Sequence, residues 1–136
     1  MTEAPLISTI IAIGLIPVAF LFTHALISGR RKLRYHSVTG TAGVVWDLGL
    51  SIFYMLYRLF GGEVKVDPGL VAYFAVHGLI AAVVIALEIT MLSTGLLQVI
   101  RKKKFLLHKR LSIPLYVLWF GAFLSGEVVY LVYYVL

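Results

Sequence analysis

Two short basic segments, each lying between two long apolar runs, constrain this chain more than any other feature. Ten of the twelve Lys and Arg residues lie in them, four in 30–34 and six in 101–110. Apolar runs of about twenty residues cross bilayers as helices, and Lys and Arg collect in the loops on the cytoplasmic side. We therefore expect a multi-pass plasma-membrane protein in a lipid bilayer, with cytoplasmic basic loops and both chain ends outside.

Composition supports this fold class. Of the 136 residues, 61% are hydrophobic, whereas soluble domains are roughly half apolar. Short connections between the runs predict an all-α, antiparallel four-helix bundle in one domain, 1–136. Pro17 should kink the first helix. The expected helices cover about 5–28, 36–60, 69–100 and 108–136.

The composition and motifs of the chain exclude several classes of site and function. The chain has no cysteine, which excludes disulfides, thiolate metal sites and covalent c-type haem attachment. Because the basic residues are explained by topology, no nucleic-acid partner is expected. No nucleophile–base pair or phosphate loop is present, so an electron-transfer or assembly protein is indicated rather than a stand-alone catalyst.

Ionisable side chains inside the apolar runs are the candidate functional residues, because such groups are costly in a bilayer and usually face the bundle interior. Three histidines lie near the basic loops and the other ionisable groups lie deeper. The full set is His24, His36, Asp47, Arg58, His77, Glu88, His108 and Glu127.

His36 and His108 are the leading candidates. Each follows a basic pair by five residues, counted from Arg31 and Lys103, so their depths match on helices that run parallel and lie diagonally in an up-down bundle. That arrangement suits axial ligation of a b-type haem through both histidines. The alternative is that both histidines are interfacial residues.

We expect neighbouring residues to belong to the same haem site. Gly40 and Gly43 share the helical face of His36 and would leave room for a macrocycle, although glycines in membrane helices also serve helix packing. His24 lies at a similar depth and would replace or hydrogen-bond a ligand. The basic residues expected near the haem propionates are Arg31, Lys104, Lys109 and Arg110.

A second site is expected in the outer half. His77 lies 24 residues before Arg101, or ~36 Å along a helix, at the level of Tyr54, Met55 and Glu127. This level suits a second haem, a copper ion or a quinol headgroup, with a structural polar cluster as the alternative. Arg58 belongs to the same level.

Asp47 and Glu88 are expected near mid-depth on adjacent helices. Two carboxyl groups there would pass protons between the ends of the bundle, and a proton-linked carrier is a weaker third hypothesis for the whole chain. The structural alternative is a hydrogen bond to a neighbouring Ser, Thr or Trp.

The chain also resembles a known family. The likeness rests on His108-Lys109-Arg110 with Ile113-Pro114 to Trp119 and Ser125-Gly126, on Tyr73 to Ala82 around His77, on His36, and on Tyr57-Arg58. These stretches resemble the small YozB/CtaM-type membrane proteins over about 24–134. After the histidine that matches His36, the family has basic residues and a Met, and this chain has Ser37-Val38-Thr39-Gly40 instead. The resemblance implies a role in maturation or assembly of haem–copper oxidases.

Two functions follow as hypotheses. The first is a haem-binding, b-type-cytochrome-like protein, with one or two haems, for electron transfer or haem handling at a respiratory oxidase or another membrane electron-transfer complex. The second is a cofactor-free or copper-binding assembly factor or accessory subunit. Homo-oligomers are compatible with both. A faint internal repeat, which aligns His36 with His108 and brings Trp46 and Trp119 within one position, suggests duplication of a two-helix unit.

Overall fold

The computed structural model describes residues 5–32, 34–61 and 66–136, so part of the loop at 62–65 and the first four residues lie outside it. The regular structure in these ranges is helical. The elements in chain order are α1 (Leu6–Gly14), α2 (Ile16–Arg30), α3 (His36–Leu59), the 3-10 helix η1 (Pro68–Leu70), α4 (Val71–Arg101), α5 (Leu106–Tyr130) and the π-helix η2 (Leu131–Val135).

Four helical segments of the described chain are long and apolar enough to cross a membrane, which confirms the predicted helix number and class. The first of them combines α1 and α2, and its break lies at Leu15, with Pro17 in the first turn of α2. A kink near Pro17 was predicted, because proline cannot donate the backbone hydrogen bond that would continue the helix.

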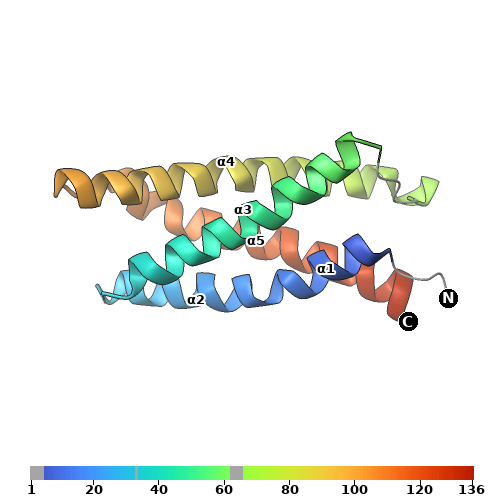
Figure 1. Ribbon diagram of the computed structural model, residues 1–136, viewed down its shortest axis with the longest axis horizontal. Coiled ribbons are helices and arrows are strands. Elements are labelled where there is room, and N and C mark those ends of the chain that lie inside the picture. Colours follow the sequence, from blue (N-terminus) through green and yellow to red (C-terminus); the bar gives the residue numbers. More distant parts are fainter. Residues whose placement is uncertain (1–4, 33, 62–65) are drawn as a thin grey trace.

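The helices form two antiparallel hairpins. α2 packs along α3, α4 packs along α5, and the hairpins meet through the α3–α4 and α2–α5 contacts. α3 and α5 are therefore diagonal neighbours in the bundle, and they run in the same direction. Both basic connections lie at one end of the bundle, and both chain termini lie at the other end (Figure 1).

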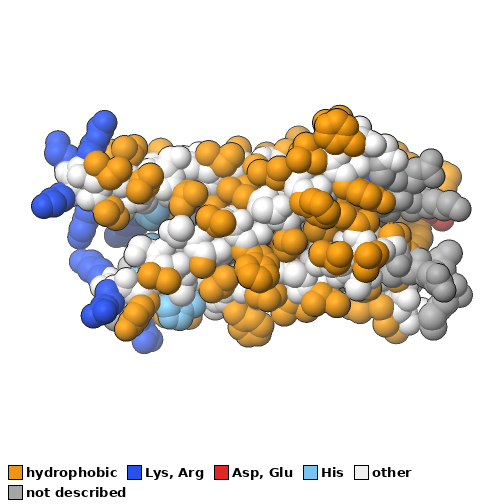
Figure 2. Space-filling model, viewed as in Figure 1, with side chains coloured by type: hydrophobic (Ala, Val, Ile, Leu, Met, Phe, Trp, Pro, Cys, Tyr) orange, Lys and Arg blue, Asp and Glu red, His pale blue; other side chains and the backbone are white. Residues whose placement is uncertain are grey.

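A small aromatic core joins the two hairpins. Its buried members are Val18, Phe22, Val44, Val84, Leu115 and Trp119. The Phe22 and Trp119 rings meet edge to face at 5.1 Å between centroids. Most other large apolar side chains lie on the outside of the bundle, where they cover the surface between the ends (Figure 2). Water-soluble proteins rarely expose so large an apolar surface.

The two basic connections turn in a similar way. Lys32 and Lys102 have positive φ angles of 55° and 50°, and they follow the ends of α2 and α4. The left-handed conformation satisfies the carbonyl groups at a helix end, but it costs a residue with a side chain about 1 kcal/mol relative to glycine. The basic turns therefore store a little strain at corresponding places.

Candidate functional site

His36 and His108 meet across the bundle diagonal at the basic end. His36 opens α3 and His108 lies in the first turn of α5. Their ring centroids are 6.1 Å apart and the ring planes are nearly perpendicular, at 87°. The sequence predicted that these two side chains would face each other at equal depth, and the structure brings their rings together across the diagonal.

Each of these histidines is held through Nδ1. The Nδ1 atom of His36 lies 2.6 Å from the carbonyl oxygen of Ala25, and that of His108 lies 3.1 Å from the carbonyl oxygen of Met91. A carbonyl oxygen can only accept, so both Nδ1 atoms donate. In the neutral imidazole each Nε2 atom then keeps its lone pair, and neither Nε2 atom has a hydrogen-bond partner in the described part of the chain. This is the tautomer of a histidine that ligates a metal through Nε2.

Thr94 adds a second contact to His108. Its Oγ1 atom lies 2.9 Å from the His108 Nδ1 atom and donates its own proton to the Thr90 carbonyl at 2.8 Å. Thr94 therefore accepts from His108, and two acceptors of α4 fix the orientation of this ring.

A glycine on the preceding helix makes room for each ring. A Cβ atom at Gly29 would lie 2.7 Å from Cε1 of His36, and one at Gly95 would lie 3.2 Å from Cε1 of His108. The first distance is impossible without movement of the ring, and the second is tight. Gly29 and Gly95 were not identified from the sequence. The spacing Ala25-x-x-x-Gly29, typical of close helix packing, was the available signal.

The 6.1 Å separation of the two ring centroids equals the spacing expected for two imidazoles on one metal ion. With metal–nitrogen bonds of about 2 Å and ring centres roughly 1 Å beyond each nitrogen, two imidazoles on opposite sides of one metal have centroids about 6 Å apart. His, Cys, Asp and Glu do not gather in threes or more at any metal-like site among the described residues. A pair of histidines is sufficient for haem, because the porphyrin supplies the other four ligands.

Gly40 and Gly43 both lie against α2 in the structure. A Cβ atom at Gly43 would lie 2.7 Å from the Phe22 ring, and one at Gly40 would lie 3.8 Å from Cβ of Ala25. Both glycines face α2, so they let α2 and α3 pack closely and leave no room there for a macrocycle. Any haem would have to lie on another side of the histidine pair.

His24 does not join the pair. It is exposed, and its Nδ1 atom bonds to Thr39 Oγ1 at 3.0 Å. The haem-ligand role considered for it is therefore not supported by its position. The basic residues expected near the propionates are all exposed, and Lys and Arg side chains cluster at this end with histidines just inside them (Figure 2). Those residues are Arg31, Lys104, Lys109 and Arg110.

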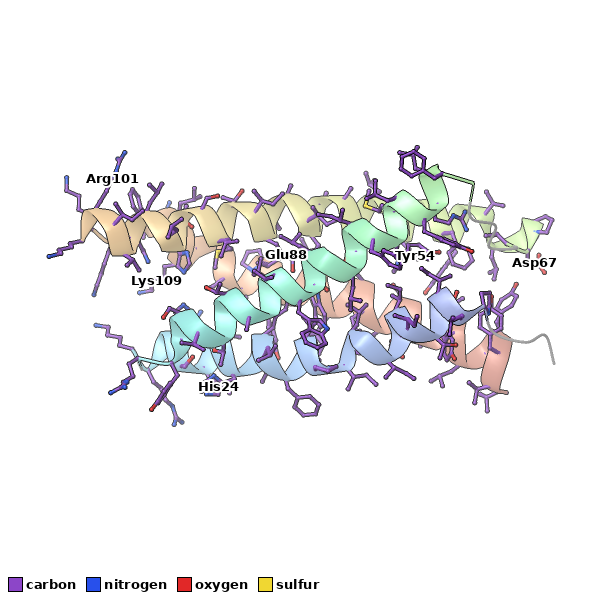
Figure 3. The ribbon with its side chains drawn as sticks, in the orientation of Figure 1. His24, Tyr54, Asp67, Glu88, Arg101 and Lys109 are labelled. Carbon is purple, nitrogen blue, oxygen red and sulfur yellow. The ribbon has the colours of Figure 1, made fainter. Side chains whose placement is uncertain are left out.

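The residues predicted at the outer level line one cavity of about 400 Å³, which we call the outer cavity. Its polar and sulfur-containing lining includes Tyr54, Met55, Arg58, His77 and Glu127. Figure 3 shows Tyr54 toward the end that carries Asp67, far from Lys109 at the basic end. The outer cavity is thus separate from the histidine pair.

His77 has the same tautomer as the other two histidines. Its Nδ1 atom lies 2.8 Å from Ser125 Oγ, and that hydroxyl donates to the Ala122 carbonyl, also at 2.8 Å. Ser125 must then accept from His77, which leaves the His77 Nε2 lone pair unused.

Asp47 and Glu88 come together in the centre of the bundle. Asp47 is 3% exposed and accepts a hydrogen bond from Trp119 Nε1 at 2.9 Å, with Ser51 more distant at 3.5 Å. Glu88 is fully buried, and its carboxyl group lies near that of Asp47. Neither Glu88 oxygen finds a donor among the described residues. The predicted pairing to a tryptophan is therefore found for Asp47, while Glu88 lacks a donor.

No protein-family model, curated protein or solved structure matches this chain. The functional argument therefore rests on the geometry of the histidine pair, the outer cavity and the central carboxyl groups.

Proposed function

We propose that this protein is a membrane-embedded, b-type-cytochrome-like haem protein that serves electron transfer or haem handling for a respiratory haem–copper oxidase. One observation carries the proposal: His36 and His108 face each other with ring centroids 6.1 Å apart, and both Nε2 lone pairs are unused. Two opposed, oriented imidazoles are what a six-coordinate haem requires of its protein.

The histidines and the carbonyl groups that hold them would have different roles. His36 and His108 would hold the iron, and the Ala25 and Met91 carbonyls would fix the two rings through Nδ1. A bound haem supplies a one-electron couple. If His36 and His108 both held the iron, the haem would suit transfer of electrons rather than binding of a small substrate.

The residues around the histidine pair support the same proposal of a haem site. The exposed basic residues at this end would pair with haem propionates, and the positive-inside rule puts this end on the cytoplasmic side of the plasma membrane. Both chain termini would then lie outside. The resemblance to YozB/CtaM-type proteins adds the link to oxidase maturation.

A second candidate is a cofactor-free or copper-binding assembly factor. It is favoured by the packing of Phe22 against Gly43, which fills the space in which a macrocycle was expected. Copper(I) accepts few ligands and suits imidazole, so the same histidine pair would hold it without a porphyrin.

The test is an absorbance spectrum of the detergent-purified protein, oxidised and then reduced with dithionite, together with a pyridine haemochrome assay. Sharp reduced α and β bands at one haem per chain are expected. His36→Ala and His108→Ala should each abolish the six-coordinate spectrum, while His24→Ala should leave it unchanged. A protein that stays colourless when produced with excess haem, and that binds copper(I) through the same histidines, would support the second candidate instead.

A further inference from the structure

The outer cavity has the size and enclosure of a small-molecule site. It is about 400 Å³ and is lined from α1, α3, α4 and α5, within the range of roughly 300–1,000 Å³ typical of ligand pockets. Most of its lining residues belong to the segments long enough to cross a membrane, and Figure 3 shows one of them, Tyr54, in the half of the bundle away from Lys109.

The walls of the outer cavity suit a flat ring. Trp119 and Phe123 both line it, and their rings are stacked with centroids 5.0 Å apart at 13°. Tyr73 and Phe74 line it from α4. Aromatic rings pack favourably against other rings in offset-stacked or edge-to-face geometry.

Three polar groups that line this cavity have no hydrogen-bond partner among the described residues. They are the Tyr54 hydroxyl on α3, the His77 Nε2 atom on α4 and the Glu127 carboxyl group on α5. The His77 tautomer makes its Nε2 an acceptor, and the Tyr54 hydroxyl can donate. Groups from three helices are thus left for a ligand that both donates and accepts.

We propose that the outer cavity binds a membrane-soluble quinol or quinone, with the ring against the aromatic wall and its oxygens at Tyr54, His77 and Glu127. A lipid tail would leave all three polar groups unpaired, and a charged headgroup would not suit the aromatic wall. His, Cys, Asp and Glu do not gather in threes among the described residues, which disfavours a metal ion that needs three or more such ligands. The proposal does not rest on haem at the histidine pair.

The two tryptophans provide an internal reporter. Trp119 lines the outer cavity, whereas Trp46 is 52% exposed and bonds to the Gly14 carbonyl. In a Trp46→Phe background, decylubiquinone is titrated into the purified protein and quenching of Trp119 fluorescence is followed. Saturable quenching is expected.

A matched pair of glycine variants tests the location. A Cβ atom at Gly78 or at Gly121 would meet nothing within 4 Å, so leucine should be tolerated at both positions. Gly78 lines the outer cavity and Gly121 is not among its lining residues. Gly78→Leu should weaken quinone binding at least tenfold, and Gly121→Leu should leave it unchanged. His77→Leu should weaken binding by about tenfold, the value of one hydrogen bond.

Two results would overturn the proposal. One is quenching that rises without saturation and equally in all variants, which would show partition into the detergent micelle. The other is displacement of decylubiquinone by an equal concentration of dodecanol, which would assign the cavity to a lipid tail. Both results are read from Trp119 and are independent of whether His36 and His108 bind haem.

Discussion

Replacing Gly29 by alanine should displace the His36 ring, because the new Cβ atom would lie 2.7 Å from Cε1 and 2.8 Å from Nδ1. The ring cannot move away without stretching its 2.6 Å hydrogen bond to Ala25. Overpacking costs about 1–3 kcal/mol and the lost hydrogen bond about 1 kcal/mol, against a gain of about 0.5–1 kcal/mol from removing a helical glycine. The net loss of unfolding free energy should be about 1–3 kcal/mol.

Two assays follow this change. Thermal unfolding in detergent should show a lower Tm, by roughly 4 °C for each kcal/mol in a chain of this size. Haem titration should show an affinity about 10–100-fold weaker, the usual cost of losing a partner that orients a metal ligand. Gly95→Ala should also lower Tm and haem affinity, but by a smaller amount, since its Cβ atom would lie 3.2 Å from Cε1 of His108.

Gly121→Ala is the matched control, because its Cβ atom would meet nothing within 4 Å. It should leave haem binding unchanged and raise Tm slightly. If Gly29→Ala behaves like Gly121→Ala in both assays, the His36 ring is not held where the structure places it, and the argument for an oriented ligand pair fails.

Three further predictions concern stability, each read from Tm in detergent. Trp119→Phe removes the donor to buried Asp47 and should cost about 1 kcal/mol, as interhelical hydrogen bonds in membranes do; an unchanged Tm would refute the contact. Glu88→Gln replaces one of two carboxyl oxygens that lack a donor by an amide NH2 that can donate to the neighbouring Asp47, so Tm should rise, and a fall would show that Glu88 has a partner. Lys102→Gly relieves a positive φ of 50° and should add about 1 kcal/mol; no gain would argue against the left-handed turn.

The sequence was sufficient to predict how His36 and His108 meet. Charge placement set the direction of each helix, and equal distances from Arg31 and Lys103 set equal depths on parallel helices. The direction of a helix and the depth of a residue along it depend only on the topology and the rise per residue. They could therefore be predicted without knowing how the side chains pack. The break near Pro17 was predictable for a similarly local reason.

The role of Gly40 and Gly43 could not be predicted in the same way. Helical periodicity correctly places them near the His36 face, but it does not show what covers that face. In the structure α2 covers it, and the Phe22 ring occupies the space beside Gly43. The glycines that accommodate the histidine rings are Gly29 and Gly95, on the preceding helices, and identifying them requires knowing how each hairpin is packed.

The two hairpins repeat one local arrangement. In the first, the Ala25 carbonyl accepts from His36, and Gly29, four residues after Ala25, lies against the same ring. In the second, the Met91 carbonyl and Gly95 have the same relation to the other histidine. The faint repeat predicted from the sequence thus has a counterpart in three-dimensional contacts.

The repeat explains why the histidines oppose each other. Two similar hairpins packed side by side, with corresponding helices parallel, are related by an approximate two-fold axis along the bundle, as in parallel repeats of membrane proteins. Residues at corresponding positions on the diagonal helices α3 and α5 must then approach that axis from opposite sides. His36 and His108 are such residues. The connection from Gly29 to His36 is six residues shorter than that from Gly95 to His108. When the two sequences are aligned at the histidines, Gly29 and Gly95 therefore do not align with each other. A duplicated hairpin with one histidine, one carbonyl acceptor and one glycine therefore suffices to build a symmetric pair of oriented histidines.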